Sequence, residues 1–237
     1  MKLGNRLNIR TTKVGSEFTP ANLSNLLAWY KFDTGMSNTT GGSPIEGDDI
    51  VTWRDQSGND NHLTAPNNYF VYEASTGSAV SVNGSDDKFH MTTQLNLEQF
   101  SLYMRVNVSA HDGGATDLLF LDKDTATTDF FRVQGNTEVR CKISGASAIK
   151  WTTGTLDTAV FTNYGFERDS SNDVRAYSNG SALTASTAIN TTGVLDLDAI
   201  GTNFDGKIKE VVITSSSLSS ADRTNLQAYL ANLTQGE

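Results

Sequence analysis

The 237-residue sequence is poor in cysteine, proline and charge. Its one cysteine, Cys141, excludes a disulfide framework within the chain and supplies too few thiolates for a cysteine-based metal site. Cys141 stands in the alternating run 137–143, which predicts a core-facing position on a strand. Charged residues make up 19%, below the usual quarter, and no apolar stretch approaches the length of a transmembrane helix.

Acidic residues outnumber basic ones, giving a net charge of −9 and a pI of about 4.8. Because an acidic surface repels phosphate backbones, we expect no nucleic-acid partner for the main domain, and no membrane partner. The first ten residues contain no apolar core of the kind found in Sec-type signal peptides. The sequence therefore predicts synthesis in a cytoplasm, without a signal peptide.

Apolar segments separated by turn residues predict an all-β chain in one large domain. The clearest segment is 100–108, where apolar residues alternate along one face. Further segments are 26–32, 88–91, 118–121, 130–133, 160–168, 174–178 and 208–213. Asn179 and Gly180 form the strongest short hairpin signal. Strands at this spacing predict two antiparallel sheets packed face to face, with a barrel as the alternative.

One short helix is predicted near the C-terminus, at about 219–233. Ser219 can cap it, and Asp222, three residues later, is a capping-box partner. An apolar stripe follows at helical spacing, formed by Leu226, Tyr229, Leu230 and Leu233. We expect this stripe to pack on the sandwich.

Residues 1–20 differ in composition from residues 21–237, so we divide the chain into an arm and a sandwich domain. The arm carries four basic residues against one acid, Glu17, and ends at Pro20. We expect it to be extended and to dock on a partner protein, with a frayed terminus as the alternative. The residues predicted to make this contact are Lys2, Leu3, Arg6, Leu7, Ile9, Arg10 and Lys13.

Three segments carry a family resemblance: 28–33 (AWYKFD), 53–63 (WRDQSGNDNHL) and 204–213 (FDGKIKEVVI), the last followed by 218–223 (LSSADR). Together they resemble the concanavalin A-like, laminin-G-like jelly-roll family, over about residues 23–233. The versions they match best are modules of phage virion proteins and bacterial surface proteins. The resemblance implies a two-sheet antiparallel jelly-roll sandwich with one short C-terminal helix. It implies less about function, because this fold serves lectins, glucanases, adhesins and capsid parts.

Four residues of the segment 53–63 place side-chain oxygens on every second position: Asp55, Ser57, Asn59 and Asn61. A tight loop with this spacing can wrap calcium, the one cofactor that the sequence suggests. However, its sixth position is Asp60 rather than glycine, and Asp and Asn also bond their own backbone in metal-free turns. A structural corner and a calcium site both remain open.

Aromatic rings and amides mix in the segment 67–72, which follows Pro66. Rings beside polar groups are typical of sugar-binding surfaces, so we predict glycan contacts from Asn68, Tyr69 and Tyr72. The alternative places Phe70 in the core and Tyr69 on the surface.

Signatures of the enzymes built on this fold are missing. Glucanases carry a Glu-x-Asp-x-x-Glu strand, and only Glu46 and Asp48 approach it, in a loop without a second glutamate. The Arg-x-Glu-x-Arg strand of alginate lyases and the Asp-boxes of sialidases are absent. We therefore expect a non-catalytic protein.

These observations predict a structural or decoration protein on the capsid or tail surface of a bacteriophage virion, made in the host cytoplasm. The arm would bind other virion proteins, and the sandwich would project and contact host or environmental glycans. A carbohydrate-binding adhesin module of a bacterial or phage surface protein is the alternative. A glycan hydrolase on the same fold is the second alternative.

Overall fold

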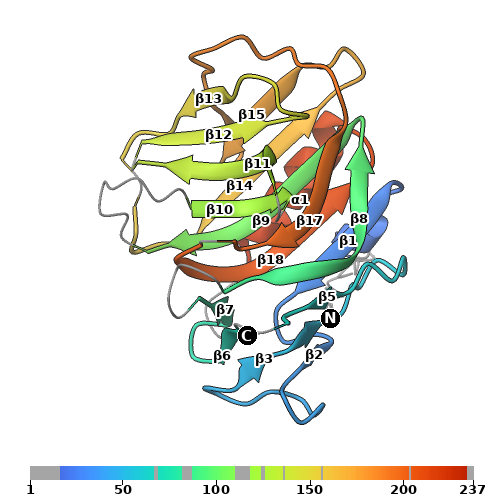
Figure 1. Ribbon diagram of the computed structural model, residues 1–237, viewed down its shortest axis with the longest axis vertical. Coiled ribbons are helices and arrows are strands. Elements are labelled where there is room, and N and C mark those ends of the chain that lie inside the picture. Colours follow the sequence, from blue (N-terminus) through green and yellow to red (C-terminus); the bar gives the residue numbers. More distant parts are fainter. Residues whose placement is uncertain are drawn as a thin grey trace, which may run out of the picture.

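The computed structural model describes residues 17–66, 69–81, 87–109, 118–123, 126–135, 137–155, 157–202 and 204–233. Within these ranges the strands form two nine-stranded sheets, and the paired strands run antiparallel. The two sheets, called sheet A and sheet B and defined by their strands below, lie face to face. Sheet B is the nearer one in Figure 1. The predicted two-sheet antiparallel sandwich with one short C-terminal helix is confirmed.

Sheet A contains the strands β16 (Ser181–Ala182), β15 (Val174–Ser178), β14 (Thr162–Arg168), β9 (Phe100–Val108), β18 (Gly206–Thr214), β7 (Ser78–Val80), β6 (Phe70–Glu73) and β3 (Asp49–Ile50), in this spatial order, and β1 (Leu26–Lys31), which also pairs with β18. Sheet B runs β13 (Ile149–Thr152), β12 (Glu138–Lys142), β11 (Ala126–Gln134), β10 (Leu118–Lys123), β17 (Leu195–Ile200), β8 (Phe89–Leu97), β5 (Leu63–Thr64), β4 (Thr52–Trp53) and β2 (Met36–Ser37).

The main core lies between the two sheets and is rich in aromatic rings. The ring of Phe131 in β11 packs between Phe100 and Phe166 of sheet A, with ring centroids 5.6 and 4.7 Å away. Cys141 is fully buried in this core, as its alternating context predicts, and burial raises the pKa of its thiol. The core therefore fills from inward-facing residues of both sheets, as expected for a sandwich.

Two turns have the form that the sequence predicts. Asn179 and Gly180 both adopt positive φ angles, 47° and 82°, and join β15 to β16 as a two-residue hairpin. The segment 53–63 ends β4 at Trp53, turns, and begins β5 at Leu63, so it forms the predicted corner between two strands.

Helix α1 (Ser220–Ala231) packs on the outer face of sheet A, on the side away from sheet B (Figure 1). Ser219 caps it, because its hydroxyl accepts a hydrogen bond from the Asp222 N–H at 3.1 Å. Leu226 and Leu230 are fully buried against Tyr103 and Val212, whereas Tyr229 and Leu233 pack at the edge of the same cluster. The predicted apolar stripe thus faces the sheet.

A buried polar network ties α1 to sheet A. The Arg223 guanidinium donates to both carboxylate oxygens of Glu167, at 2.6 and 2.9 Å, and the Tyr103 hydroxyl donates to the same carboxylate at 2.6 Å. Gly165 lies directly opposite Tyr103, and a Cβ atom there would come within 2.1 Å of the Tyr103 ring. Glycine at this position is therefore what allows the ring to lie flat against the sheet beneath α1.

The last residues of the predicted arm, 18–20, lie against the domain. Phe18 packs against the cluster beneath α1, and Thr19 precedes the short 3₁₀ helix η1 (Pro20–Asn22), whose first residue is buried. Residues 18–20 thus belong to the packed domain, because their apolar atoms have a surface to cover. No helix in the described ranges is long and apolar enough to cross a membrane.

Candidate functional site

The corner at residues 54–62 is organised by the carboxylate of Asp55, which is 7% exposed. Its Oδ1 accepts hydrogen bonds from the backbone N–H groups of Trp29 and Ser57, both at 2.8 Å. Its Oδ2 accepts from the Ser57 hydroxyl at 2.7 Å and from the Asn61 N–H at 3.1 Å. Four donors from the protein itself therefore surround the Asp55 carboxylate.

Asn59 and Asn61 direct their amide nitrogens toward β1. The Asn59 Nδ2 donates to the Leu26 carbonyl at 2.9 Å, and the Asn61 Nδ2 donates to the Leu27 carbonyl at 2.8 Å. In the part of the chain that the structure describes, no group of three or more His, Cys, Asp or Glu side chains is placed to hold a metal ion. These contacts form a structural corner fastened to β1, and calcium binding here stays a prediction.

Of the residues predicted to bind glycan, Tyr69 and Tyr72 lie in the described part of the chain. Tyr69 is half-buried against the core. Tyr72 is only 7% exposed, so its ring offers no stacking face to a sugar. Instead the Tyr72 hydroxyl donates to Asp33 Oδ1 at 2.7 Å, and its ring stacks on Phe32 with centroids 4.7 Å apart. Asn68 lies outside the described residues, as do the predicted docking residues of the arm: Lys2, Leu3, Arg6, Leu7, Ile9, Arg10 and Lys13.

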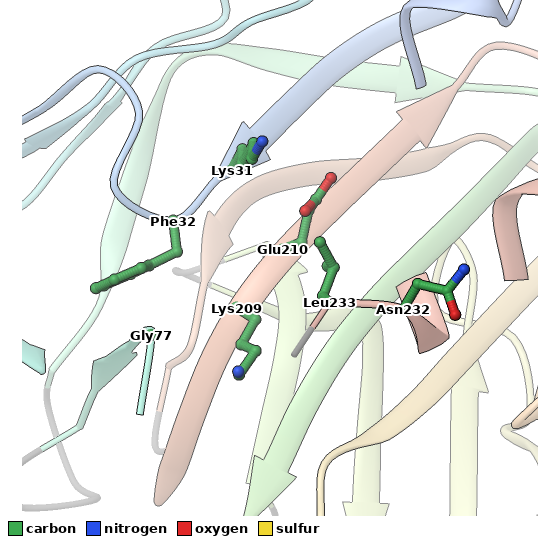
Figure 2. A pocket seen from close by; sticks show the side chains of 7 residues that line it. All are labelled: Lys31, Phe32, Gly77, Lys209, Glu210, Asn232 and Leu233. Atoms are coloured by element: carbon green, nitrogen blue, oxygen red, sulfur yellow. The ribbon is translucent and has the colours of Figure 1, made fainter. Parts of the chain in front are cut away.

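The candidate functional site is a pocket of about 220 Å³ on the outer side of sheet A, and Phe32 is one of the residues that line it. Strand β1 and the residue after it supply Lys31 and Phe32, and β18 supplies Lys209 and Glu210. The two residues after α1, Asn232 and Leu233, and Gly77 complete the lining. Figure 2 shows Phe32 on one side of this pocket and the Glu210 carboxylate on the other.

The pocket continues into a second hollow of about 440 Å³, because Lys31, Asn232 and Leu233 line both. Phe18 and Tyr229 add two further half-buried rings there. We call the combined depression the β1–α1 groove. Its residues are Glu17, Phe18, Thr19, Lys31, Phe32, Gly77, Lys209, Glu210, Asn225, Ala228, Tyr229, Asn232 and Leu233.

Glu210 is the most perturbed acid of the groove. It is 1% exposed, and burial raises its pKa from 4.5 to about 7. The Trp29 indole N–H donates to Glu210 Oε1 at 2.5 Å, and the neighbouring Tyr229 hydroxyl and Lys31 charge also lower the pKa, but together they do not offset the desolvation. Burial and the neighbouring Glu210 also raise the pKa of Tyr229. A carboxyl that titrates near neutral pH can donate or accept a hydrogen bond.

The two lysines of the groove differ in their availability. Lys31 is half-buried and lies beside Glu210. Lys209 is 3% exposed, and its ammonium lies 4.6 Å from the centre of the Phe161 ring. Burial, and then the charge of Arg105, lower the pKa of Lys209. Lys31 is therefore the lysine better placed to meet a ligand.

The sequence reasoning did not find this groove. Lys31 and Phe32 stand in the segment 28–33, where their regular strand pattern gives no sign of a pocket. Glu210 appears isolated in the sequence, and its partners Trp29 and Tyr229 come from opposite ends of the chain. One signal in the sequence was this glutamate, because it directly precedes the apolar end of the strand segment 208–213. A buried charge is costly unless it is paired or hydrogen-bonded, so a glutamate at such a position indicates a specific environment.

Comparison with solved structures identifies the architecture as concanavalin A-like. The binding domain of Paraclostridial Mosquitocidal Protein 1 matches with a TM-score of 0.60 and 12% identity, over 90% of this chain and 54% of that one. Trypanosoma rangeli sialidase matches with a TM-score of 0.62 and 12% identity, over 90% and 34% of the two chains. The ligand-binding domain of botulinum neurotoxin serotype D, solved with N-acetylneuraminic acid, matches with a TM-score of 0.56 and 12% identity, over 88% and 51%.

The chain thus spans about half the length of the two toxin structures and about a third of the sialidase. At this level of identity the likeness shows the fold alone. No protein-family model matches the sequence, and no curated protein matches it.

Proposed function

We propose that this domain is a carbohydrate-binding module and that the β1–α1 groove is its binding site. One observation carries the proposal: the pocket of Figure 2 is lined both by the half-buried Phe32 ring and by residues that carry three polar groups of different chemistry. These are the Lys31 ammonium, the Glu210 carboxyl and the exposed Asn232 amide.

This combination fits a sugar better than an apolar ligand. An aromatic ring can cover the C–H face of a sugar ring, while an ammonium, a carboxyl and an amide offer the donors and acceptors that hydroxyl groups need. The stack of Phe32 on Tyr72 holds the Phe32 ring in place, so little side-chain freedom is lost on binding. In this proposal Phe32 contacts the sugar, and Tyr72 supports the Phe32 ring without contacting the sugar itself.

The solved structures of the same fold suggest the first ligands to test. Two of those proteins, the botulinum neurotoxin domain and Trypanosoma rangeli sialidase, were solved with sialic acids. A sialic acid carries a carboxylate, which would pair with Lys31. We therefore propose a sialylated glycan as the first candidate.

We propose binding without catalysis. Hydrolysis of a glycosidic bond by two carboxyl groups needs both on either side of the bond. Among the described residues, two carboxylic acids line the β1–α1 groove: Glu210 lines the pocket of Figure 2, whereas Glu17 lines only the second hollow. We further propose that a virion carries the module, a setting supported by the family resemblance of 28–33 and 53–63 and by the basic arm.

A glycan array followed by calorimetry tests the proposed site. We expect sialylated glycans to bind, and Lys31→Gln and Phe32→Leu each to weaken binding about tenfold or more, which corresponds to about 1.4 kcal/mol. Arg54→Gln is the matched control, because it removes one charge from an exposed residue outside the groove. An array without any bound glycan, or variants that bind like the unmodified protein, would remove the proposal.

A further inference from the structure

Sheet B presents a concentration of positive charge on its outer face, remote from the β1–α1 groove. Strands β11, β12 and β13 lie side by side at one end of the sheet (Figure 1). They carry Arg132, Arg140, Lys142 and Lys150, which we call the basic face. In the strand register Arg132 lies opposite Arg140, and Arg140 lies opposite Lys150, so three of the four form one row across three strands.

The alternation of the strands turns these side chains outward. In β12, Val139 and Cys141 are fully buried between the sheets, so Arg140 and Lys142 point to the opposite side. In β13, the buried residues Ile149 and Trp151 flank Lys150 in the same way. All four basic residues are partly exposed.

A row of like charges is an unfavourable arrangement in a sheet, because directly opposed charges of one sign repel each other. Two acids lie within these three strands, Asp129 and Glu138, against the four bases. Asp129 is buried and accepts a hydrogen bond from the Ser144 N–H at 2.7 Å. Glu138 pairs with Arg140 at 2.7 Å. These three strands therefore carry more basic than acidic residues, in a chain whose overall charge is −9.

The basic face borders an open groove of about 510 Å³, lined by Phe130, Arg132, Lys142 and residues 145–148. The Arg132 guanidinium lies 4.2 Å from the centre of the Phe130 ring, and its Nη2 donates to Gln134 Oε1 at 2.9 Å. These two contacts fix the plane of the guanidinium. A fixed guanidinium fork matches the two oxygens of a carboxylate better than an ammonium does.

We infer that the basic face binds an acidic polysaccharide whose repeating sugars carry carboxylates. Arg132 and Lys142 would hold carboxylates in the groove, and Arg140 and Lys150 would meet the following ones along the row. A polymer can satisfy such a row because its charges repeat, whereas a single sugar reaches only one or two of these side chains.

This inference does not depend on the proposed function of the β1–α1 groove. The two sites lie on the outer faces of different sheets, and the basic face shares no residue with the groove. A domain with both sites would contact glycans from two sides.

Binding of labelled polygalacturonate to the whole chain, measured by fluorescence anisotropy at low salt, tests the inference. We expect Lys142→Gln to weaken binding several-fold and the Arg132→Gln, Lys142→Gln double variant at least about tenfold. Added sodium chloride should weaken binding by the unmodified protein, since these charges are exposed to screening. Arg54→Gln removes one charge from an exposed residue outside both sites, so it is the control and should bind like the unmodified protein.

Arg132 packs on Phe130, so the folding of each variant is checked by its unfolding midpoint, and Lys142→Gln alone still tests the site if the double variant is unstable. Three results would overturn the inference. The first is that the unmodified protein does not bind polygalacturonate. The second is that Arg54→Gln loses as much affinity for polygalacturonate as Lys142→Gln. The third is that methyl-esterified polygalacturonate or single-stranded DNA binds as tightly as polygalacturonate.

Discussion

Glu210 is a buried carboxylic acid whose surroundings disfavour its charged form. Its pKa of about 7 in the folded protein exceeds its usual 4.5, because the side chain is 1% exposed. Below pH 4.5 the carboxyl is protonated in the folded and the unfolded chain, and its burial costs little. As the pH rises from 4.5 to 7, the unfolded chain releases the proton first, so the free energy of unfolding falls.

Glu210→Gln should remove this pH dependence. A shift from 4.5 to about 7 corresponds to a loss of roughly 3 kcal/mol in the free energy of unfolding between pH 4.5 and pH 8. The Glu210→Gln variant keeps a carbonyl oxygen to accept the Trp29 indole N–H and has no charge to bury. Urea denaturation at several pH values would measure both proteins, with the exposed Glu98→Gln as the control for lost charge. Parallel pH profiles for Glu210→Gln and the unmodified protein would contradict the assignment.

Asp55 shows where residue patterns stop being informative. Oxygens on every second position are compatible with calcium and with a hydrogen-bonded turn, and the sequence leaves both open. The structure supplies long-range partners that the segment 53–63 cannot reveal, since Trp29 donates to Asp55 and β1 accepts from Asn59 and Asn61. A local motif therefore predicts the corner but not what the corner holds.

Helix α1 packs against sheet A on one side and lines the candidate site with other residues. Its buried residues anchor it to sheet A, and Asn225, Ala228 and Tyr229 face the groove, followed by Asn232 and Leu233. The position of the groove therefore depends on the packing of α1.

Leu230→Ala should destabilise the domain by about 2–5 kcal/mol, because it deletes buried methyl groups that α1 packs against sheet A. Thermal or urea denaturation gives the value. Asn225→Ala, at an exposed position of the same helix, should change stability by less than about 0.5 kcal/mol. A loss below about 1 kcal/mol at Leu230 would mean that α1 contributes little to the fold.

The sequence predicts elements well where a local signal is complete. The alternation in 100–108, the Asn179–Gly180 pair and the capped stripe of 219–233 correspond to β9, the β15–β16 hairpin and α1. Strand β17 was missed, although Leu195 and Leu197 alternate with polar residues and are buried. The groove was also missed, because pockets form where elements distant in sequence meet, and periodicity within one element carries no information about that meeting.

On the scale of the whole molecule, the described domain begins before residue 20. Phe18 covers part of the cluster beneath α1, and Pro20 is buried, whereas Glu17 is exposed at the rim of the groove. The four basic residues of the arm precede this point, between Lys2 and Lys13. Docking on a virion partner and packing of the domain should therefore be separable by truncation.

Removing residues 1–16 should leave the melting temperature and glycan binding unchanged, because the packed cluster starts at Phe18. Removing residues 1–20 should lower stability by about 1–3 kcal/mol, since the Phe18 ring and Pro20 lose their burial.

If the arm docks the module on a particle, the shorter truncation should already abolish attachment in a co-sedimentation assay with assembled particles. Attachment of the full chain should also weaken with added salt, because contacts between exposed charges are screened. A protein lacking residues 1–16 that still decorates particles fully would place the docking surface on the sandwich, where the basic face would be the first region to examine.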